Sequence, residues 1–436
     1  MTGGPAADLT IDRLHGSLDD PAFESMNLLN EVSADFPDAI SFAAGRPHEG
    51  FFDLDEVAGH VERFRDHLRR RFGGDETLVR RTLLQYGRTK GIIHDLVARS
   101  LAVDEKIDVD PEAVVVTVGC QEALYVTLRA LRRDERDVLV VPRPCYVGVT
   151  GAAGLVEMPL VPVTETSAGI DPDEVARVVL AAKAAGRRPR ALYVVADFAN
   201  PTGASLDREA RERLLDLAAE HDFLILEDNP YGVFHDGTER PPTFKALDRD
   251  RRVVYLGSFA KTGVAGARVG YVVADQRVSD GAGGTALLAD QLAKIKSMLT
   301  VNTSPLAQAV IGGKLLANDY SLRAANERER RVYQRNLRQV LDGLAARFPA
   351  GSEPRVGWNV PAGGFFVVLD LPFPAGDELL RDCARTHGVL WTPMHHFHGQ
   401  AEPLSRIRLS FSSLTSEQIE VGLDRLAAFV HARCAT

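Results

Sequence analysis

The segment LGSFAKTGVAGARVGY (residues 256–271) contains a lysine whose neighbours match two motifs of known chemistry. Lys261 completes an S-x-x-K motif that begins at Ser258, and the same lysine begins a K-T-G motif. Serine acyl-transfer enzymes use both motifs, but with a different lysine in each. Since one lysine serves both motifs here and no S-D-N lies between them, we reject serine acyl transfer.

A second motif, YGRTK at residues 86–90, has the Y-x-x-x-K spacing of short-chain dehydrogenases. Such enzymes seat a dinucleotide on a glycine-rich turn that follows the first strand and precedes the tyrosine. In this chain the glycine cluster that begins at Gly263 lies far downstream of the tyrosine and lacks the G-x-G-x-x-G spacing. We therefore reject a dehydrogenase.

The elements that must position Lys261 alternate regularly between about residue 76 and residue 300. Short runs rich in Val, Leu and Ile are separated by long segments with helical periodicity. The runs are AVVVTVG (113–119), DVLVVP (137–142), VEMPLVPV (156–163), RALYVVADF (190–198), DFLILED (222–228) and RVVYLGS (252–258). Continuous apolar strands that alternate with helices predict an α/β domain with a mainly parallel sheet covered on both faces.

The pattern changes after residue 300, where longer helices and fewer strands predict a smaller α+β unit. Its expected elements are one long helix at 318–348, GGFFVVLDL (363–371), a helix near 376–387, SRIRLSFS (405–412) and a closing helix from about 415 to 433. The expected divisions are an N-terminal arm at 1–75, a large domain at 76–317 and a small domain at 318–436. We expect the arm to pack on the small domain or on another subunit.

Composition limits the class of protein. The 436 residues are 45% hydrophobic and 25% charged, which is typical of a folded globular chain. The net charge of -9 argues against nucleic-acid binding, and no apolar run is long enough to span a membrane. The N-terminus lacks the features of a signal peptide, and the four cysteines form no C-x-x-C pair. We therefore expect a cytoplasmic protein with no nucleic-acid or membrane partner.

Polar residues stand where the predicted strands end. Asp228 closes the run DFLILED, and Tyr231 follows it in EDNPYG. Asn200 lies in ANPTG, directly after the run RALYVVADF. Each of these residues alone would be an ordinary turn or cap residue. Because α/β folds bind ligands at the carboxyl ends of their strands, we expect the three to lie beside Lys261.

The first predicted strand ends at a candidate anion site. TVGCQEAL (117–124) places Gly119, Cys120 and Gln121 where a strand gives way to a helix, so their backbone N–H groups are free. Arg268, downstream of Lys261, adds a fixed positive charge. Pyridoxal phosphate requires this set of groups: an amine that bonds to it, a carboxylate that keeps its ring nitrogen protonated, and donors for its phosphate.

The chain resembles the class I and II, fold-type-I aminotransferases. The resemblance rests on NPTG, EDNPYG, SFAK followed by ARVGY, TVGCQEAL, PCYVG and RIRLSFS, and it extends from about SFAAGRPHEGFF to the last helix. It implies a large pyridoxal-phosphate-binding domain with a mainly parallel, seven-stranded sheet, a small α+β domain, and a homodimer with shared active sites. It also implies amino-group transfer between an L-amino acid and a 2-oxo acid.

The resemblance also implies a role for each residue that matches a motif. The catalytic residues would be Lys261, which forms the Schiff base, Asp228 at the ring nitrogen and Tyr231 at the ring oxygen. The other cofactor-binding residues would be Gly119, Cys120, Gln121, Ser258 and Arg268 at the phosphate, Tyr146 on the ring face, Asn200 at the ring oxygen, and Tyr86 at the phosphate of the neighbouring subunit. The substrate-binding residues would be Arg408 at the α-carboxylate, Gly45 and Asn200.

Two positions near the expected phosphate site depart from the family pattern. Ala260 stands where a hydroxyl residue usually precedes the lysine, and Ala265 replaces the usual proline before G-x-R. We therefore expect the phosphate site to rely more on Arg268, Ser258 and backbone N–H groups. Cys120 stands where a small residue is common, and we interpret it as a small buried thiol.

The stretches FAAGRPHEGFFDL and CYVGVTGAA resemble the branch of the family that contains the arylglycine transaminases of glycopeptide-antibiotic pathways. These enzymes make hydroxyphenylglycines, including 3,5-dihydroxyphenylglycine. The same motifs also serve cyclases, oxidases, decarboxylases and elimination enzymes, because the cofactor supplies the carbanion chemistry, and that alternative stays open. A cofactor-binding sensor with a DNA-binding head is a further alternative, but residues 1–75 lack a basic recognition helix.

Three histidines lie close together in PMHHFHG (393–399). His395, His396 and His398 lack the i, i+4 spacing of helical metal ligands and have no obvious acidic ligand nearby in the sequence. We interpret the segment as the rim of the substrate pocket or as a plain surface loop, and we predict no metal site.

Overall fold

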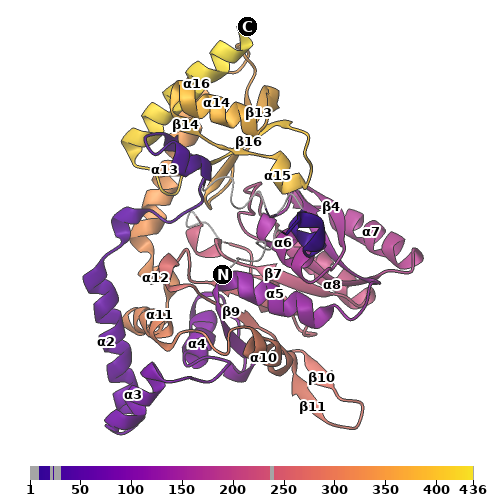
Figure 1. The fold of residues 1–436 in the computed structure, drawn as a ribbon, viewed down its shortest axis with the longest axis vertical. Coiled ribbons are helices and arrows are strands. Elements are labelled where there is room, and N and C mark those ends of the chain that lie inside the picture. The colour runs from indigo at the N-terminus through magenta and orange to yellow at the C-terminus, as the bar shows by residue number, and fades with distance from the viewer. Residues whose placement is uncertain (1–8, 20–22, 24–30, 236–239, 436) are drawn as a thin grey trace, which may run out of the picture.

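An eight-stranded sheet forms the centre of the larger of two units (Figure 1). The computed structural model describes residues 9–19, 23, 31–235 and 240–435, so parts of the predicted N-terminal arm lie outside the described residues. In spatial order the strands are β2 (Val114–Val118), β9 (Val269–Val273), β8 (Val253–Ser258), β7 (Leu224–Asp228), β6 (Arg188–Val194), β3 (Asp137–Arg143), β4 (Leu160–Thr166) and β5 (Gly169–Ile170).

The strands from β8 to β4 pair in parallel. Strand β9 is antiparallel to both of its neighbours, and β5 is antiparallel to β4. The expected mainly parallel sheet is therefore confirmed. It has eight strands rather than the seven expected, because the chain turns back after β4 and adds the two-residue β5 at the edge.

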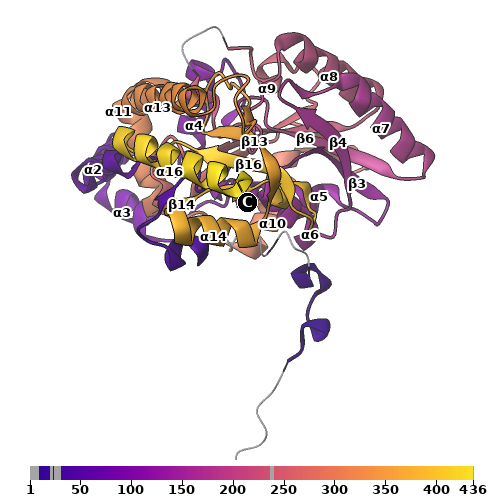
Figure 2. The ribbon, with the colours of Figure 1, turned by 90° about the horizontal axis from the view of Figure 1, so that it is seen from above.

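Helices cover both faces of this sheet (Figure 2). On one face they are α5 (Gly119–Leu131), α6 (Val147–Leu155) and α10 (Leu288–Leu299), and on the other α7 (Pro172–Ala184), α8 (Arg208–Glu220) and α9 (Phe244–Leu247). Side chains of a strand point alternately to its two faces. Leu139 and Val141 of β3 accordingly pack with the first group of helices, whereas Val140 packs with the second. The sheet thus divides the core into two apolar layers.

The N-terminal arm contacts both units. Its strand β1 (Ile40–Ser41) pairs in parallel with β14 (Val389–Leu390) of the small unit. Its helix α2 (Leu54–Arg71) packs along α11 (Pro305–Ala317) of the large unit. This approach requires Gly313, since a Cβ there would stand 1.9 Å from the carbonyl oxygen of His60. The segment between β1 and α2 is therefore anchored at both ends.

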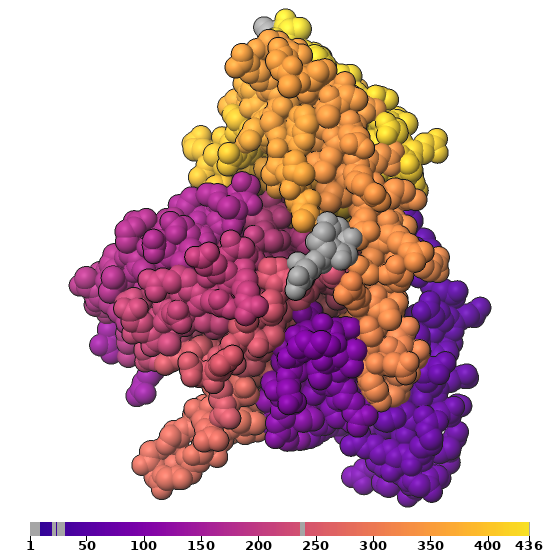
Figure 3. Space-filling model, turned by 180° about the vertical axis from the view of Figure 1, so that it is seen from behind, coloured from indigo at the N-terminus to yellow at the C-terminus, as the bar shows by residue number. Residues whose placement is uncertain are grey.

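Shorter elements complete the large unit. Helices α3 (Glu76–Leu84) and α4 (His94–Asp104) join α2 and α11 in one apolar cluster beside β2 and β9. Strands β10 (Arg277–Ser279) and β11 (Thr285–Leu287) form a hairpin that projects from the body (Figure 3). The 3-10 helices are η1 (Ile11–Arg13), η2 (Gly16–Asp19), η3 (Glu49–Phe51), η4 (Pro111–Ala113), η5 (Gly232–Phe234) and η6 (Ala265–Ala267).

The small unit is built on a four-stranded antiparallel sheet. Its strands, in spatial order, are β12 (Gly357–Trp358), β13 (Phe366–Ala375), β16 (Leu404–Ser410) and β15 (Thr392–Pro393). The helices of this unit are α13 (Glu327–Arg347), α14 (Asp377–His387), α15 (His395–His398) and α16 (Ser416–Cys434). Its apolar cluster includes the fully buried Trp391 and draws on side chains from Leu337 onward and on Phe42 of the arm. The domain boundary near residue 318 stays a prediction.

The single long helix predicted for residues 318–348 is wrong. The structure has the short α12 (Leu322–Ala325), a break at Asn326, and then α13. Asn326 is almost fully buried, and its side-chain amide donates to the carbonyl oxygens of Thr262 and Leu322 (2.9 and 2.8 Å). A side chain that bonds the backbone locally competes with helix formation, so the chain bends here. The hydrogen bond from Asn326 to Thr262 also ties the start of α13 to the loop that contains Lys261.

None of the helices in the described part of the chain is both long and apolar enough to cross a membrane.

Candidate active site

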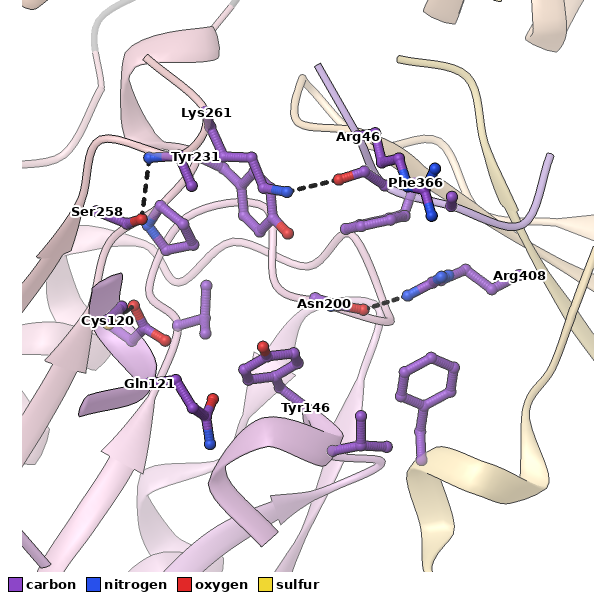
Figure 4. A pocket seen from close by; sticks show the side chains of 18 of the residues that line it. Arg46, Cys120, Gln121, Tyr146, Asn200, Tyr231, Ser258, Lys261, Phe366 and Arg408 are labelled. Atoms are coloured by element: carbon purple, nitrogen blue, oxygen red, sulfur yellow. Dashed lines mark hydrogen bonds between the residues drawn. The ribbon is translucent and has the colours of Figure 1, made fainter. Parts of the chain in front are cut away.

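A cavity of about 330 Å³ lies at the carboxyl ends of β6, β7 and β8, between the large sheet and the small unit (Figure 4). The large unit contributes turns and helix starts, the arm contributes Ala43–Arg46, and the small unit contributes Thr392, Phe397 and Arg408. The predicted site residues that line the cavity are Gly45, Cys120, Gln121, Tyr146, Asn200, Asp228, Tyr231, Ser258, Lys261, Arg268 and Arg408.

Two predicted residues do not line the cavity. Gly119 lies directly beneath the guanidinium of Arg268. Tyr86 follows α3 and is 81% exposed, outside the cavity of its own chain. The trans role implied for Tyr86 stays a prediction.

Lys261 lies in the turn after β8, with its amine inside the cavity. Its Nζ donates to the backbone oxygen of Gly45 (2.6 Å) and lies 5.9 Å from the ring centre of Phe365. Burial, and to a lesser extent the positive charges of Arg408, Arg268 and Arg46, together lower the pKa of Lys261 to about 8. A lysine with such a pKa has a substantial neutral fraction near neutral pH and can act as a base.

Asp228 is the last residue of β7, and its carboxylate has two side-chain donors. The hydroxyl of Tyr193 donates to Oδ2 (2.8 Å), and the thiol of Cys120 donates to Oδ1 (3.5 Å). Burial raises the pKa of Asp228 to about 6, while the two hydrogen bonds oppose that rise. Burial also raises the pKa of Cys120, so this thiol stays protonated and serves as a donor. A positive partner in the cavity would stabilise the carboxylate.

The turn between β2 and α5 forms a cradle beneath Arg268. Gly119 has a φ of +70°, and a Cβ there would stand 2.5 Å from Nη2 of Arg268, so both conformation and space demand glycine. The first backbone N–H groups of α5 have no partner within the helix. Ser258 borders the same cavity, and its hydroxyl accepts a hydrogen bond from the backbone N of Ala260 (3.1 Å). A guanidinium and a helix N-terminus together suit a phosphate.

Besides Tyr193, which donates to Asp228, the tyrosines Tyr146 and Tyr231 line the cavity. Gly148 leaves room for the ring of Tyr146, since a Cβ at position 148 would stand 2.3 Å from that ring. Tyr231 packs edge-on against Phe366, with 5.6 Å between the ring centres. Burial raises the pKa of both tyrosines, so both hydroxyls are protonated at neutral pH. They are therefore hydrogen-bond donors.

Arg408 projects from β16 into the cavity. Its Nη1 donates to Oδ1 of Asn200 (2.6 Å), and its Nη2 donates to the oxygen of Ala43 (2.8 Å) and to Oγ1 of Thr392 (3.1 Å). The guanidinium lies between the rings of Phe366 and Phe397, at 4.3 and 4.8 Å from their centres.

The charge of Arg408 has no acidic partner in the described part of the chain. No carboxylate there comes within 4.0 Å of the guanidinium, and its Nε is buried without a hydrogen bond. Burial lowers the pKa of Arg408 to about 10, so the group is charged at neutral pH. An unpaired buried cation favours an anionic ligand.

The structure brings an acidic residue to two of the three histidines, which the sequence around them does not show. Asp377, at the start of α14, lies with its Oδ1 2.7 Å from Nε2 of His396 and 3.6 Å from Nε2 of His395. These three residues form a group of possible metal ligands, and His396 also lines the cavity. His398 is part of the same helix α15, and its Nε2 is buried without a partner in the described structure. Spacing along the sequence does not reveal a contact that packing creates.

Several cavity residues were not found from the sequence. Tyr193, Arg46, Phe366 and Phe397 all line the cavity. Tyr193 lies within the apolar run of β6, where a tyrosine reads as an ordinary strand residue. No pattern in the sequence distinguishes it from the other buried residues of that strand.

Comparison with known proteins agrees with this geometry. The family description "Aminotransferase class I and II" matches residues 53–426. The chain belongs to the class I and II aminotransferases. The enzyme is therefore an aminotransferase that uses pyridoxal phosphate and moves an amino group between an amino acid and a 2-oxo acid.

Three aminotransferases align with this chain over most of their length. The chain is 56% identical over 430 residues, 99% of this chain and 96% of the relative, to the (S)-3,5-dihydroxyphenylglycine transaminase of Amycolatopsis orientalis. It is 28% identical to aromatic-amino-acid aminotransferase 1 of Thermococcus litoralis, covering 89% of this chain and 87% of that one. The kynurenine aminotransferase of Pyrococcus horikoshii, solved with PMP, superposes with a TM-score of 0.81 at 26% identity, covering 97% of this chain and 98% of that one.

Proposed function

We propose that this aminotransferase interconverts an arylglycine of the 3,5-dihydroxyphenylglycine type and the corresponding aryl 2-oxo acid. The observation that carries the proposal is the 56% identity, over 99% of the chain, to a transaminase of that name. The cavity is consistent with an aromatic substrate, because Phe366, Phe397 and Tyr146 all border it.

The proposed cofactor site uses the contacts described above. Bound pyridoxal phosphate acts as the electron sink that makes the Cα proton of the amino acid acidic. Asp228, buried and held by Tyr193 and Cys120, would keep a proton on the ring nitrogen of the bound cofactor. Gly119, Cys120, Gln121, Ser258 and Arg268 would bind the phosphate, Tyr146 would lie against the ring, and Asn200 and Tyr231 would donate to the ring oxygen.

Lys261 is the proposed acid–base residue. Its lowered pKa of about 8 leaves part of the amine neutral at physiological pH, so it can accept the proton from Cα. Its amine is held 2.6 Å from the oxygen of Gly45, in the part of the cavity that the arm closes. The amine of Lys261 is therefore already held inside the cavity before it accepts a proton.

Arg408 is proposed to bind the α-carboxylate of the substrate. Its planar guanidinium can donate two parallel hydrogen bonds to a carboxylate, and the two flanking rings fix its plane. Asn200, which Arg408 contacts directly, couples this end of the cavity to the cofactor end. Gly45 borders the same space, where a Cβ would stand 2.6 Å from the ring of Phe366.

We also propose that the enzyme is a homodimer in which Tyr86 reaches the phosphate of the neighbouring subunit. Apolar side chains are exposed on adjoining segments around it, namely Leu84, Tyr86, Met298, Leu299, Val301 and Leu306. The segment that follows α3 lies next to the segment that follows α10, as the position of Gly87 shows: a Cβ built there would lie 3.7 Å from Nδ2 of Asn302. Exposed apolar patches of this kind favour a protein partner.

We propose a cytoplasmic location because the cysteines form no disulfide bond with one another. Cys120, Cys145, Cys383 and Cys434 are free thiols in the structure. Free thiols are typical of a reducing compartment.

The proposed substrate can be tested with a panel of amino donors against 2-oxo acceptors that includes 3,5-dihydroxyphenylglyoxylate. We expect 3,5-dihydroxyphenylglycine as the product, identified by its mass, and no product with Lys261→Ala. Preference for an aliphatic 2-oxo acid would overturn the arylglycine assignment. Release of carbon dioxide or ammonia without amino transfer to the acceptor would indicate a different reaction in this site.

A further inference from the structure

A buried ion pair lies directly behind the β2–α5 turn and has no role in the site as described so far. Nζ of Lys296, on α10, donates to Oε2 of Glu122, on α5 (2.7 Å). The side chain of Lys296 is fully buried, and that of Glu122 is almost fully buried. Two charges removed from water in this way are costly, and they persist only with good geometry and further hydrogen bonds.

The carboxylate of Glu122 holds the backbone of the turn. Its Oε2 accepts a hydrogen bond from the backbone N–H of Val118, the residue before Gly119 (2.6 Å). Its Oε1 accepts from the hydroxyl of Thr300 (2.6 Å), which also accepts from Lys296 (2.8 Å). The side chain of Glu122 thus folds back on the start of its own helix, and the N–H groups of Gly119, Cys120 and Gln121 are left for a ligand.

The carboxylate would oppose a phosphate if it were alone. A negative charge within the first turn of a helix competes with an anion for the positive end of the helix dipole. Lys296 cancels that charge from the side away from the cavity, since neither Lys296 nor Glu122 lines the cavity. The pair therefore gives the turn a rigid hydrogen-bond acceptor without a net negative charge beside the anion site.

We propose that Glu122, neutralised by Lys296 and braced by Thr300, is a positioning residue for the phosphate of pyridoxal phosphate. This inference rests on the proposed phosphate role of the β2–α5 turn. Because Glu122 acts by holding the backbone of the turn, its loss should weaken the binding of ligands that carry a phosphate and leave the binding of other ligands nearly unchanged.

The test compares the dissociation constants of pyridoxal phosphate and of pyridoxal, measured by titration of the full-length apoenzyme. Lys296→Met leaves the Glu122 carboxylate buried and unpaired, and we expect the dissociation constant of pyridoxal phosphate to rise about tenfold or more, against less than about threefold for pyridoxal. Glu122→Gln with Lys296→Met removes both charges and keeps an acceptor for Val118, so it should recover part of the lost phosphate preference.

Two further variants keep the test decisive if Lys296→Met folds poorly. Thr300→Val removes one hydrogen bond with little change of shape and should shift the ratio of the two dissociation constants in the same direction, but less. Lys294→Met, on the same helix at an exposed position, should leave the ratio unchanged.

Equal losses for the two ligands, or an unchanged ratio in both Lys296→Met and Thr300→Val, would overturn the positioning role. Arg268→Leu separates this result from a failure of the proposed site. If Arg268→Leu loses phosphate preference and the Glu122 network variants do not, only the inference fails. If neither Arg268→Leu nor the Glu122 network variants change the preference for the phosphate, both the proposed phosphate site and the inference fall.

Discussion

At the scale of single residues, the buried amine of Lys261 works against the stability of the enzyme without its cofactor. Its pKa is lowered from 10.5 in water to about 8 in the fold. Between pH 8 and 10.5 the unfolded chain therefore binds the proton more tightly than the folded chain. The free energy of unfolding should rise with pH through this window, and the full penalty is present below pH 8.

Replacing the amine should remove that penalty. We expect Lys261→Met apoenzyme to be more stable than wild-type apoenzyme at pH 7, by at most about 3 kcal/mol for the shift in pKa. The variant should also lack the rise in stability between pH 8 and 10. Urea unfolding of both apoenzymes across this range is the measurement. Parallel pH profiles for the two proteins would mean that the amine is not held in a low-dielectric site.

Arg408 decides which molecules enter the cavity, and its geometry cannot be reproduced by lysine. For α-amino acids, Arg408→Lys should cost about 2–4 kcal/mol of transition-state binding, or roughly 30-fold to 1000-fold in kcat/KM. Amines without a carboxylate should be poor substrates of the wild type and should change little in the variant. The measurement is kcat/KM for matched pairs of amino acid and amine.

The alternative for Arg408 is a structural role, in which it holds the small unit in place. In that case the variant would lose thermal stability, and amino acids and amines would suffer alike. The absence of an acidic partner within 4.0 Å among the described residues argues for the binding role.

At the scale of elements, the β2–α5 turn can be tested with two glycines of similar backbone conformation. Gly119 (φ +70°) faces Arg268, while Gly186 (φ +75°) has no atom within 4 Å of the place a Cβ would take. Both Gly→Ala changes should cost about 1 kcal/mol or more of stability from backbone strain. Only Gly119→Ala displaces the guanidinium, so it alone should weaken binding of pyridoxal phosphate, by about tenfold or more.

Thermal unfolding and cofactor titration of both variants provide the measurements. Affinities close to that of the wild type in both Gly119→Ala and Gly186→Ala would show that the cradle beneath Arg268 does not bind the phosphate. Loss of affinity in both would point to a general effect of destabilisation.

The elements also show how far a sequence can predict this fold and site. Asp228, Asn200 and Lys261 could be placed at one sheet edge because each lies at or shortly after the end of an apolar strand, and that signal is local. The break at Asn326 could not be predicted, because it depends on a bond to the oxygen of Thr262, which is distant in the sequence. The contact of Asp377 with His396 depends likewise on packing of α14 against α15. Side-chain contacts between residues far apart in the sequence could not be predicted from the sequence pattern.

At the scale of the whole molecule, the exposure of Tyr86 bears on the proposed dimer. A side chain that is 81% exposed and does not line the cavity of its own chain is poorly placed for a role in that cavity. If Tyr86 completes the phosphate site of a partner, each active site draws residues from two chains. That division of labour is testable because lesions in different chains can then complement each other.

The test mixes inactive Lys261→Ala chains with Tyr86→Ala chains and allows the subunits to exchange. With Tyr86 acting in trans, one site of each hybrid combines an intact Lys261 with the intact Tyr86 of the other chain and is active. Random pairing makes half of the dimers hybrids, so about a quarter of wild-type activity should return. With Tyr86 acting in its own chain, both hybrid sites carry a lesion and no activity returns.

Mixing Lys261→Ala with Asp228→Asn is the matched control, because both lesions then stay in the sites of their own chains and activity should remain lost. Recovery in that control would mean that the large unit does not build its site from one chain, and it would overturn the proposed arrangement of Asp228 and Lys261 together.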